Sequence, residues 1–201
     1  MSDAINEFVA ANASDWDDEI YGPGYRCAAK LKDGTELPCL IIRCQKPLTD
    51  LAIRRFKDER SGRSVFANSK DGYRKIVQNF VSVGNKLNDY DIQSVSKSRF
   101  AIPKDILDRI RGETFMSWTG WVFEMSDGRK FSYGSTFNFA FFQLPQGYEF
   151  SDIADVHNHS YVDNQGSIQD LRQLDEYSEY YASRELYRER VFFECYAQLE
   201  R

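Results

Sequence analysis

The sequence predicts an α/β fold, with a mixed β-sheet flanked by helices and an α+β extension in front of it. Three observations support this class. Two Asp-Gly turns, at 33–34 and 127–128, each separate a pair of apolar, strand-like segments. Several other segments carry apolar residues at helical spacing. The chain has 201 residues, of which 42% are hydrophobic, which is enough to bury a core.

The first half begins with a helix expected at 4–20, which ends at the breaker Tyr-Gly-Pro-Gly. A hairpin follows at 25–44. A helix at 48–60 has Thr49 or Asp50 as its cap. Residues 73–87 fit either a helix or a strand, and their start favours a helix. We expect residues 1–96 to form the α+β extension, whose role the sequence does not indicate.

In the second half, Pro103 and Gly112 bound an expected helix. A second hairpin spans 115–134. Strands are expected at 137–144 and 150–159, a helix at 167–187 and a terminal strand at 190–199. This order predicts a second α/β domain with a mixed sheet over residues 97–201.

The net charge of −5 disfavours nucleic acid and anionic membranes as partners, because both attract a basic surface. The sequence carries neither a secretion signal nor a membrane-spanning apolar run. Its four cysteines have no Cys-x-x-Cys spacing. Cys27 and Cys39 could oppose each other across the first hairpin, but without an export signal reduced thiols are favoured. We therefore expect a cytoplasmic protein.

The chain's only two histidines, His157 and His159, lie one residue apart, and Ser167 and Asp170 follow at fixed distances. Histidines at positions i and i+2 of a strand face the same side, so both can reach one metal ion. A carboxylate from the next helix would complete the set and leave one coordination position open for water, as in a catalytic zinc site. Ser167 could then donate a hydrogen bond to an oxyanion.

Structural roles compete with this interpretation. Ser167 and Asp170 also match a variant of the capping box at a helix start. The two histidines at a strand end could simply be hydrogen-bonded. A capped helix start is also compatible with a metal ligand, because it gives the ligand rigid support.

The segment His-Asn-His-Ser-Tyr-Val-Asp-Asn-Gln-Gly-Ser-Ile-Gln-Asp (157–170) resembles the motif of the JAB/MPN/JAMM metallopeptidases, including their RadC-like branch. The segment 102–112 is similar to the helix before that family's catalytic strand. The resemblance covers residues 97–201 and implies the mixed-sheet layout of JAMM and cytidine-deaminase domains. It implies Zn²⁺-dependent hydrolysis of peptide or isopeptide bonds, with a protein or peptide as the substrate and a ubiquitin-like tail as one candidate. It also implies that His157, His159 and Asp170 bind the metal and that Ser167 stabilises the tetrahedral intermediate.

Two positions depart from the family. Ser160 replaces the proline that usually follows the second histidine. Ser117 stands where the family carries its catalytic glutamate, and a serine cannot act as a general base at neutral pH. Glu113, in Glu-Thr-Phe, would share a face with residue 117 on an unbroken strand. Glu124 should face the opposite side unless a bulge intervenes, and Glu149 ranks third.

Three hypotheses follow. The chain is a JAMM-type zinc hydrolase with Glu113 as its base, or a catalytically inactive relative that binds or regulates. In the third, it is a small interaction protein, such as an immunity or phage-associated factor, whose histidines are structural.

Overall fold

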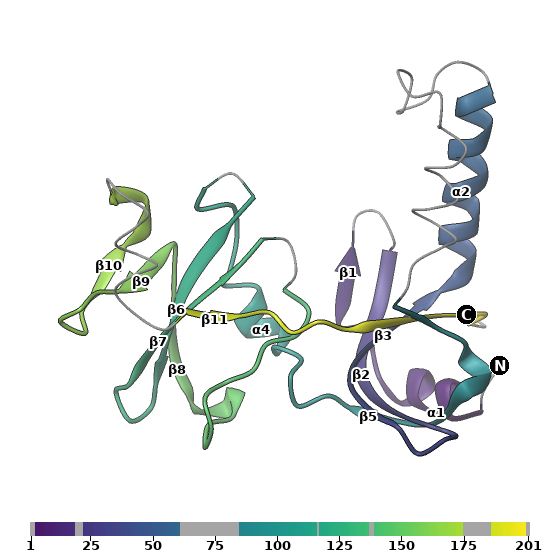
Figure 1. Cartoon of the computed structure of the whole chain (residues 1–201), viewed down its shortest axis with the longest axis horizontal. Coiled ribbons are helices and arrows are strands. Elements are labelled where there is room, and N and C mark those ends of the chain that lie inside the picture. Colours follow the sequence, from purple (N-terminus) through teal and green to yellow (C-terminus); the bar gives the residue numbers. More distant parts are fainter. Residues whose placement is uncertain are drawn as a thin grey trace. The chain divides into compact units, whose positions relative to one another are not determined.

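A computed structural model describes residues 3–18, 22–60, 85–115, 117–136, 139–174 and 186–199 (Figure 1). The chain has a mixed α/β architecture and divides into two compact units. The first comprises residues 1–98 and 192–201, and the second comprises 99–191. Within the described ranges, no helix is both long and apolar enough to cross a membrane.

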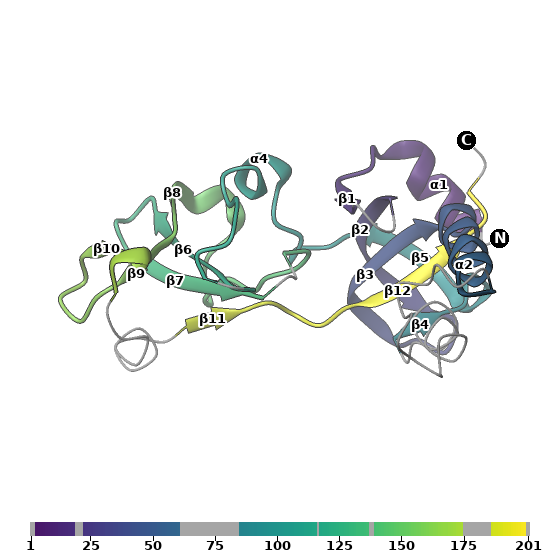
Figure 2. The same cartoon turned by 90° about the horizontal axis from the view of Figure 1, so that it is seen from above.

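The first unit is built on a mixed six-stranded sheet, and its described residues include the helices α1 and α2. In chain order its elements are α1 (Asp3–Ala11), β1 (Trp16–Asp18), β2 (Gly22–Leu31), β3 (Glu36–Cys44), α2 (Gln45–Arg60), β4 (Lys86–Leu87), the 3-10 turn η1 (Asp89–Asp91), β5 (Ile92–Lys97) and β12 (Phe193–Ala197). The strand order is β1-β2-β3-β12-β4, and β5 also pairs with β2. The terminal strand β12 runs parallel to β3 (Figure 2).

The first predicted hairpin is confirmed, because β2 and β3 pair antiparallel on either side of the Asp33-Gly34 turn. Gly34 has a φ of +91°, a conformation that side chains disfavour, and Asp33 Oδ1 accepts the N–H of Thr35 at 2.9 Å. Cys27 is paired with Leu40, so Cys39 does not lie opposite it. All four cysteines are free thiols.

Two helix boundaries differ from expectation. The first helix ends at Ala11, and residues 16–18 instead pair with β2 as the short strand β1. The second helix begins at Gln45, before the expected cap, and Thr49 donates to the Gln45 carbonyl inside it at 3.2 Å. Of the ambiguous segment 73–87, only residues 85–87 lie within the described part, where Lys86–Leu87 form a strand.

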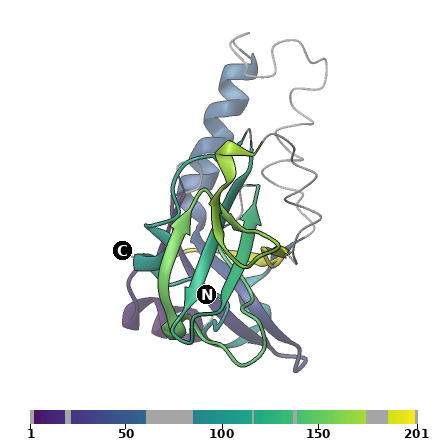
Figure 3. The same cartoon turned by 90° about the vertical axis from the view of Figure 1, so that its left-hand side faces the viewer.

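The second unit is built on a four-stranded sheet in the order β11-β7-β6-β8. In chain order its elements are α4 (Lys104–Leu107), β6 (Thr119–Met125), β7 (Lys130–Ser135), the 3-10 turn η2 (Phe150–Asp152), β8 (Ile153–Asn158), β9 (Ser160–Val162), β10 (Ile168–Asp170), the 3-10 turn η3 (Leu171–Gln173) and β11 (Leu186–Arg188). Strands β7, β6 and β8 run antiparallel side by side (Figure 3), which confirms the second hairpin.

One face of this sheet carries the core of the second unit. Trp121, Phe123 and Tyr133 are fully buried there and pack against one another and against Phe142. Burying aromatic side chains removes a large apolar area from water, so this cluster provides much of the unit's stability. The opposite face carries Glu124 and His157 and leads to the predicted site.

The segment 167–187 is not the expected helix where it is described. Ile168–Asp170 form β10, which pairs with β9, and Leu171–Gln173 form a single 3-10 turn. Residues 175–185 lie outside the described part. Apolar residues at helical spacing suggested a helix, but the hairpin pairing determines the conformation of residues 168–170.

Three further expectations change. The helix after Pro103 is only Lys104–Leu107. Within 139–144 of the expected strand at 137–144, Phe141 and Phe142 are buried but make only isolated bridges. The terminal strand, expected in the domain at 97–201, pairs with β3 in the first unit.

Candidate functional site

His157 lies near the end of β8, on the face of the sheet that is opposite the aromatic core. Val122 of β6 is its register partner, and Glu124 lies two residues further along β6 on the same face. The Nε2 atom of His157 is 2.9 Å from Glu124 Oε2 and 3.6 Å from Asp155 Oδ2. The His157 side chain is 30% exposed, so this ring lies at the surface beside two carboxylates.

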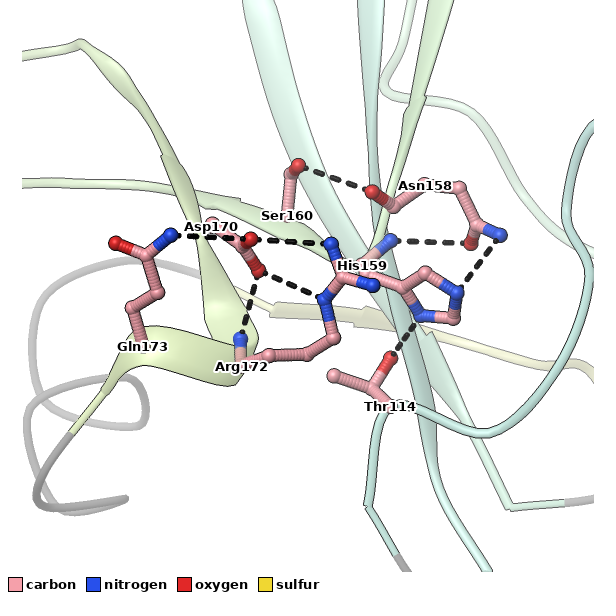
Figure 4. Close-up of polar contacts among 7 residues, drawn as sticks. All are labelled: Thr114, Asn158, His159, Ser160, Asp170, Arg172 and Gln173. Carbon is pink, nitrogen blue, oxygen red and sulfur yellow. Dashed lines mark hydrogen bonds and ion pairs between the residues drawn. The ribbon is translucent and has the colours of Figure 1, made fainter.

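His159 lies just beyond the end of β8 and has a φ of +56°, which turns the chain into β9. The two-residue alternation of the strand therefore stops before this residue. Its Nδ1 is 2.9 Å from Thr114 Oγ1, and its Nε2 is 3.3 Å from Asn158 Nδ2 (Figure 4). Its carbonyl accepts the N–H of Leu171 at 2.7 Å. Burial lowers the pKa of His159, and the charge of Arg172 lowers it further.

Asp170 ends β10 and caps the 3-10 turn that follows. Its Oδ1 accepts the Arg172 backbone N–H at 2.9 Å and Arg172 Nε at 3.1 Å, and Oδ2 accepts Arg172 Nη2 at 3.0 Å (Figure 4). Gln173 Nε2 lies 3.4 Å from Oδ2. Hydrogen bonding from the Arg172 side chain is the main reason why the pKa of Asp170 lies below its ordinary value.

Ser167 is an exposed residue at the end of the turn between β9 and β10. Its backbone N–H donates to Asp163 Oδ1 at 2.9 Å, and its carbonyl accepts the Asp163 N–H at the same distance. The capping box expected for Ser167 and Asp170 is wrong, because no helix begins here and Asp170 itself is the cap.

Glu113 does not share a strand with residue 117, because β6 begins only at Thr119. Phe115 and Trp118 exchange backbone hydrogen bonds, and Ser117 has a φ of +62°. Glu113 is exposed, and the alternation argument for it does not apply.

The other two candidate bases have different surroundings. Glu124, expected to face away from the site, is the carboxylate next to His157. Glu149 belongs to a capping box with Asp152, in which its N–H donates to Asp152 Oδ2 at 2.8 Å.

A zinc ion would need lone pairs of His157, His159 and Asp170 directed at one point. In this structure the three side chains have separate partners. His157 contacts Glu124, and His159 contacts Thr114 and Asn158. Asp170 accepts hydrogen bonds from Arg172. Among the residues that the structure describes, no three His, Cys, Asp or Glu side chains are grouped so that they could hold a metal ion. The side chains as arranged do not fit zinc, so we derive no catalytic step through it.

The sequence interpretation overlooked the residues that satisfy these groups. The motif gives no role to Asn158, which lies between the two histidines, although its amide can both donate and accept. Arg172 falls within the helix that the sequence predicts at 167–187, although it lies two residues after Asp170. Thr114 lies 45 positions before His159, and nothing local indicates that contact.

Comparison with models of known protein families, with curated proteins and with solved structures finds no match to this chain.

Proposed function

We propose that this chain is a binding or regulatory protein that recognises a protein or peptide through the β9–β10 hairpin, residues 160–170. The observation that carries the proposal is an exposed polar turn held in shape by its own contacts. Asp163 Oδ1 accepts the N–H groups of Gln165 and Ser167, and Asp163 Oδ2 accepts the Gln169 side-chain amide at 2.9 Å.

This arrangement suits recognition because Asn164, Gln165 and Ser167 are exposed at the turn. A loop that is already ordered loses less conformational entropy on binding, and amide and hydroxyl groups adapt readily to a partner's hydrogen bonds. The contacts of His159 support the same interpretation, since its ring meets Thr114 and its carbonyl accepts the Leu171 N–H at the other end of the hairpin.

The test compares binding by two double variants. The first, Asn164→Ala/Gln165→Ala, alters the hairpin turn. The second, Lys32→Ala/Glu36→Ala, alters two exposed residues on either side of the Asp33-Gly34 turn in the first unit. A partner captured from cell extract is identified and purified, and its Kd is measured for wild type and both variants. We expect the hairpin variant to bind about tenfold or more weakly, a loss of about 1.4 kcal/mol, and the control to bind normally. Equal Kd values for all three proteins would refute the proposal.

A JAMM-type zinc hydrolase, in the mixed-sheet layout of that family, is the second candidate. One observation favours it. His157, a predicted metal ligand, has a carboxylate beside it, because its Nε2 lies 2.9 Å from Glu124 Oε2. It would also require Asp170 to leave Arg172 and His159 Nε2 to leave Asn158. One equivalent of tightly bound zinc, lost in Asp170→Ala, together with zinc-dependent cleavage of a ubiquitin-like tail, would replace our first proposal by this one.

A further inference from the structure

The side-chain amide of Asn158 can be oriented from its backbone partners alone. The N–H of His159 can only donate, so the Asn158 atom that faces it at 3.1 Å is the oxygen, Oδ1. The carbonyl of Arg111 can only accept, so the atom that faces it at 2.7 Å is the nitrogen, Nδ2. The two contacts agree and leave one N–H of the amide for another acceptor.

The same amide also contacts the His159 ring. Asn158 Nδ2 has no lone pair to offer, so a hydrogen bond across their 3.3 Å contact requires His159 Nε2 to accept. The competing arrangement puts a proton on Nε2 and directs it at the Arg111 carbonyl, which already accepts the Asn158 amide. An imidazole nitrogen that accepts carries no proton, so the neutral ring holds its proton on Nδ1. Nδ1–H then donates to Thr114 Oγ1 at 2.9 Å.

The chain of contacts continues into the sheet. Thr114 Oγ1 also accepts the N–H of Gly120 in β6 at 3.0 Å. On the other side, the His159 carbonyl accepts the N–H of Leu171, a fully buried residue that follows β10. His159 therefore joins the segment 111–120 to both ends of the β9–β10 hairpin.

We propose that His159 has a structural role and holds the β9–β10 hairpin against the segment that contains Thr114. Its Nε2 lone pair accepts the Asn158 amide, and its Nδ1–H is donated to Thr114. A divalent metal ion could bind Nε2 only by displacing the amide, and displacement would loosen the corner between β8 and β9. The inference does not depend on the proposed binding function, because it concerns the unbound chain.

The first test is an NMR measurement on wild-type protein labelled with ¹⁵N-histidine at pH 7.5, where a histidine of ordinary pKa is largely neutral. Two histidine rings are expected, and a His159→Gln variant assigns them. The proposal expects a protonated-type shift at Nδ1 of His159 and an unprotonated-type shift at Nε2. The reverse pattern, or a rapidly exchanging mixture, would overturn it.

The second test uses Asn158→Ala, with Asn164→Ala as the matched control in the exposed turn of the same hairpin. Asn158→Ala should abolish the single-tautomer pattern and raise amide hydrogen exchange over residues 160–171 about tenfold. With one equivalent of Zn²⁺ added, the His159 signals of wild type should not shift. A zinc-induced shift of the His159 signals in wild type, or unchanged amide hydrogen exchange in Asn158→Ala, would contradict the structural role proposed for His159. Neither outcome requires a partner, so failure here is separate from failure of the binding proposal.

Discussion

The indole ring of Trp118 lies against the backbone of Gly134. A Cβ atom added at Gly134 would be 2.0 Å from Cζ2 of Trp118. Trp118 also packs with Tyr161 and Leu171, so this contact attaches the β9–β10 hairpin to β7. We expect Gly134→Ala to reduce the free energy of unfolding by about 1–3 kcal/mol, the usual cost of overpacking.

Urea denaturation measures this change, and Trp118→Phe provides the control. The smaller ring leaves room for the methyl group, so Gly134→Ala should cost less in a Trp118→Phe background than in wild type. Additive losses in the double variant would show that the two residues do not meet as described.

The buried guanidinium of Arg26 depends on Asp15. Its Nε lies 3.1 Å from Asp15 Oδ2, its side chain is only 1% exposed, and burial lowers its pKa despite the carboxylate. Asp15→Ala should therefore destabilise the chain by about 2–3 kcal/mol, because a buried charge loses the carboxylate that neutralises it.

The matched control is Asp50→Ala. Asp50 pairs with Lys46 at 2.6 Å, but the two side chains are 59% and 80% exposed, so the loss should stay below about 0.5 kcal/mol. Similar losses from both variants in thermal or urea unfolding would contradict this ranking.

The stability of the chain should fall as the pH drops through the range in which free histidine gains its proton. The pKa of His159 is lower in the folded chain, so near pH 6 the unfolded chain binds more protons at this site. Its contribution to stability is complete above about pH 6.5 and declines below that value until the folded pKa is reached. The His159→Gln variant should show a shallower decline between pH 7 and pH 5, as measured by urea midpoints. A decline parallel to that of wild type would argue against the lowered pKa.

The Arg172 side chain should control the acidity of Asp170. In Arg172→Ala the main cause of the lowered pKa is removed, so the Asp170 carboxyl should titrate at a higher pH than in wild type. Carbon-13 NMR of the labelled carboxyl measures the change. Lys104→Ala, at another exposed cation of the same unit, should leave it unaltered.

The four thiols should react in two groups. Cys44 is half-buried, whereas Cys27, Cys39 and Cys195 are buried, and burial raises the pKa of Cys195 to about 12. Since the thiolate is the reactive form, a disulfide reagent should modify one thiol quickly and the others only on unfolding. Loss of the fast phase in Cys44→Ser would identify it, and a second fast thiol in that variant would contradict the assignment.

Local chemistry explains which features the sequence determined by itself. The hairpins at Asp33-Gly34 and Asp127-Gly128 follow from neighbouring residues, since Gly34 and Gly128 have φ values of +91° and +82° and each aspartate accepts an N–H two residues on. The apolar segments beside these turns are strands for the same local reason. The mixed α/β class follows from the elements themselves.

The tertiary structure alone decided which groups surround the two histidines. Alternation along a strand placed both histidines on one face, but the left-handed backbone at His159 ends that alternation, and its stabilising partner Thr114 is 45 residues away. Likewise, β12 joined the first unit because it pairs with β3, about 150 residues earlier in the chain. Pairings between distant segments follow from burial and hydrogen bonding in three dimensions, and no short stretch of sequence contains them.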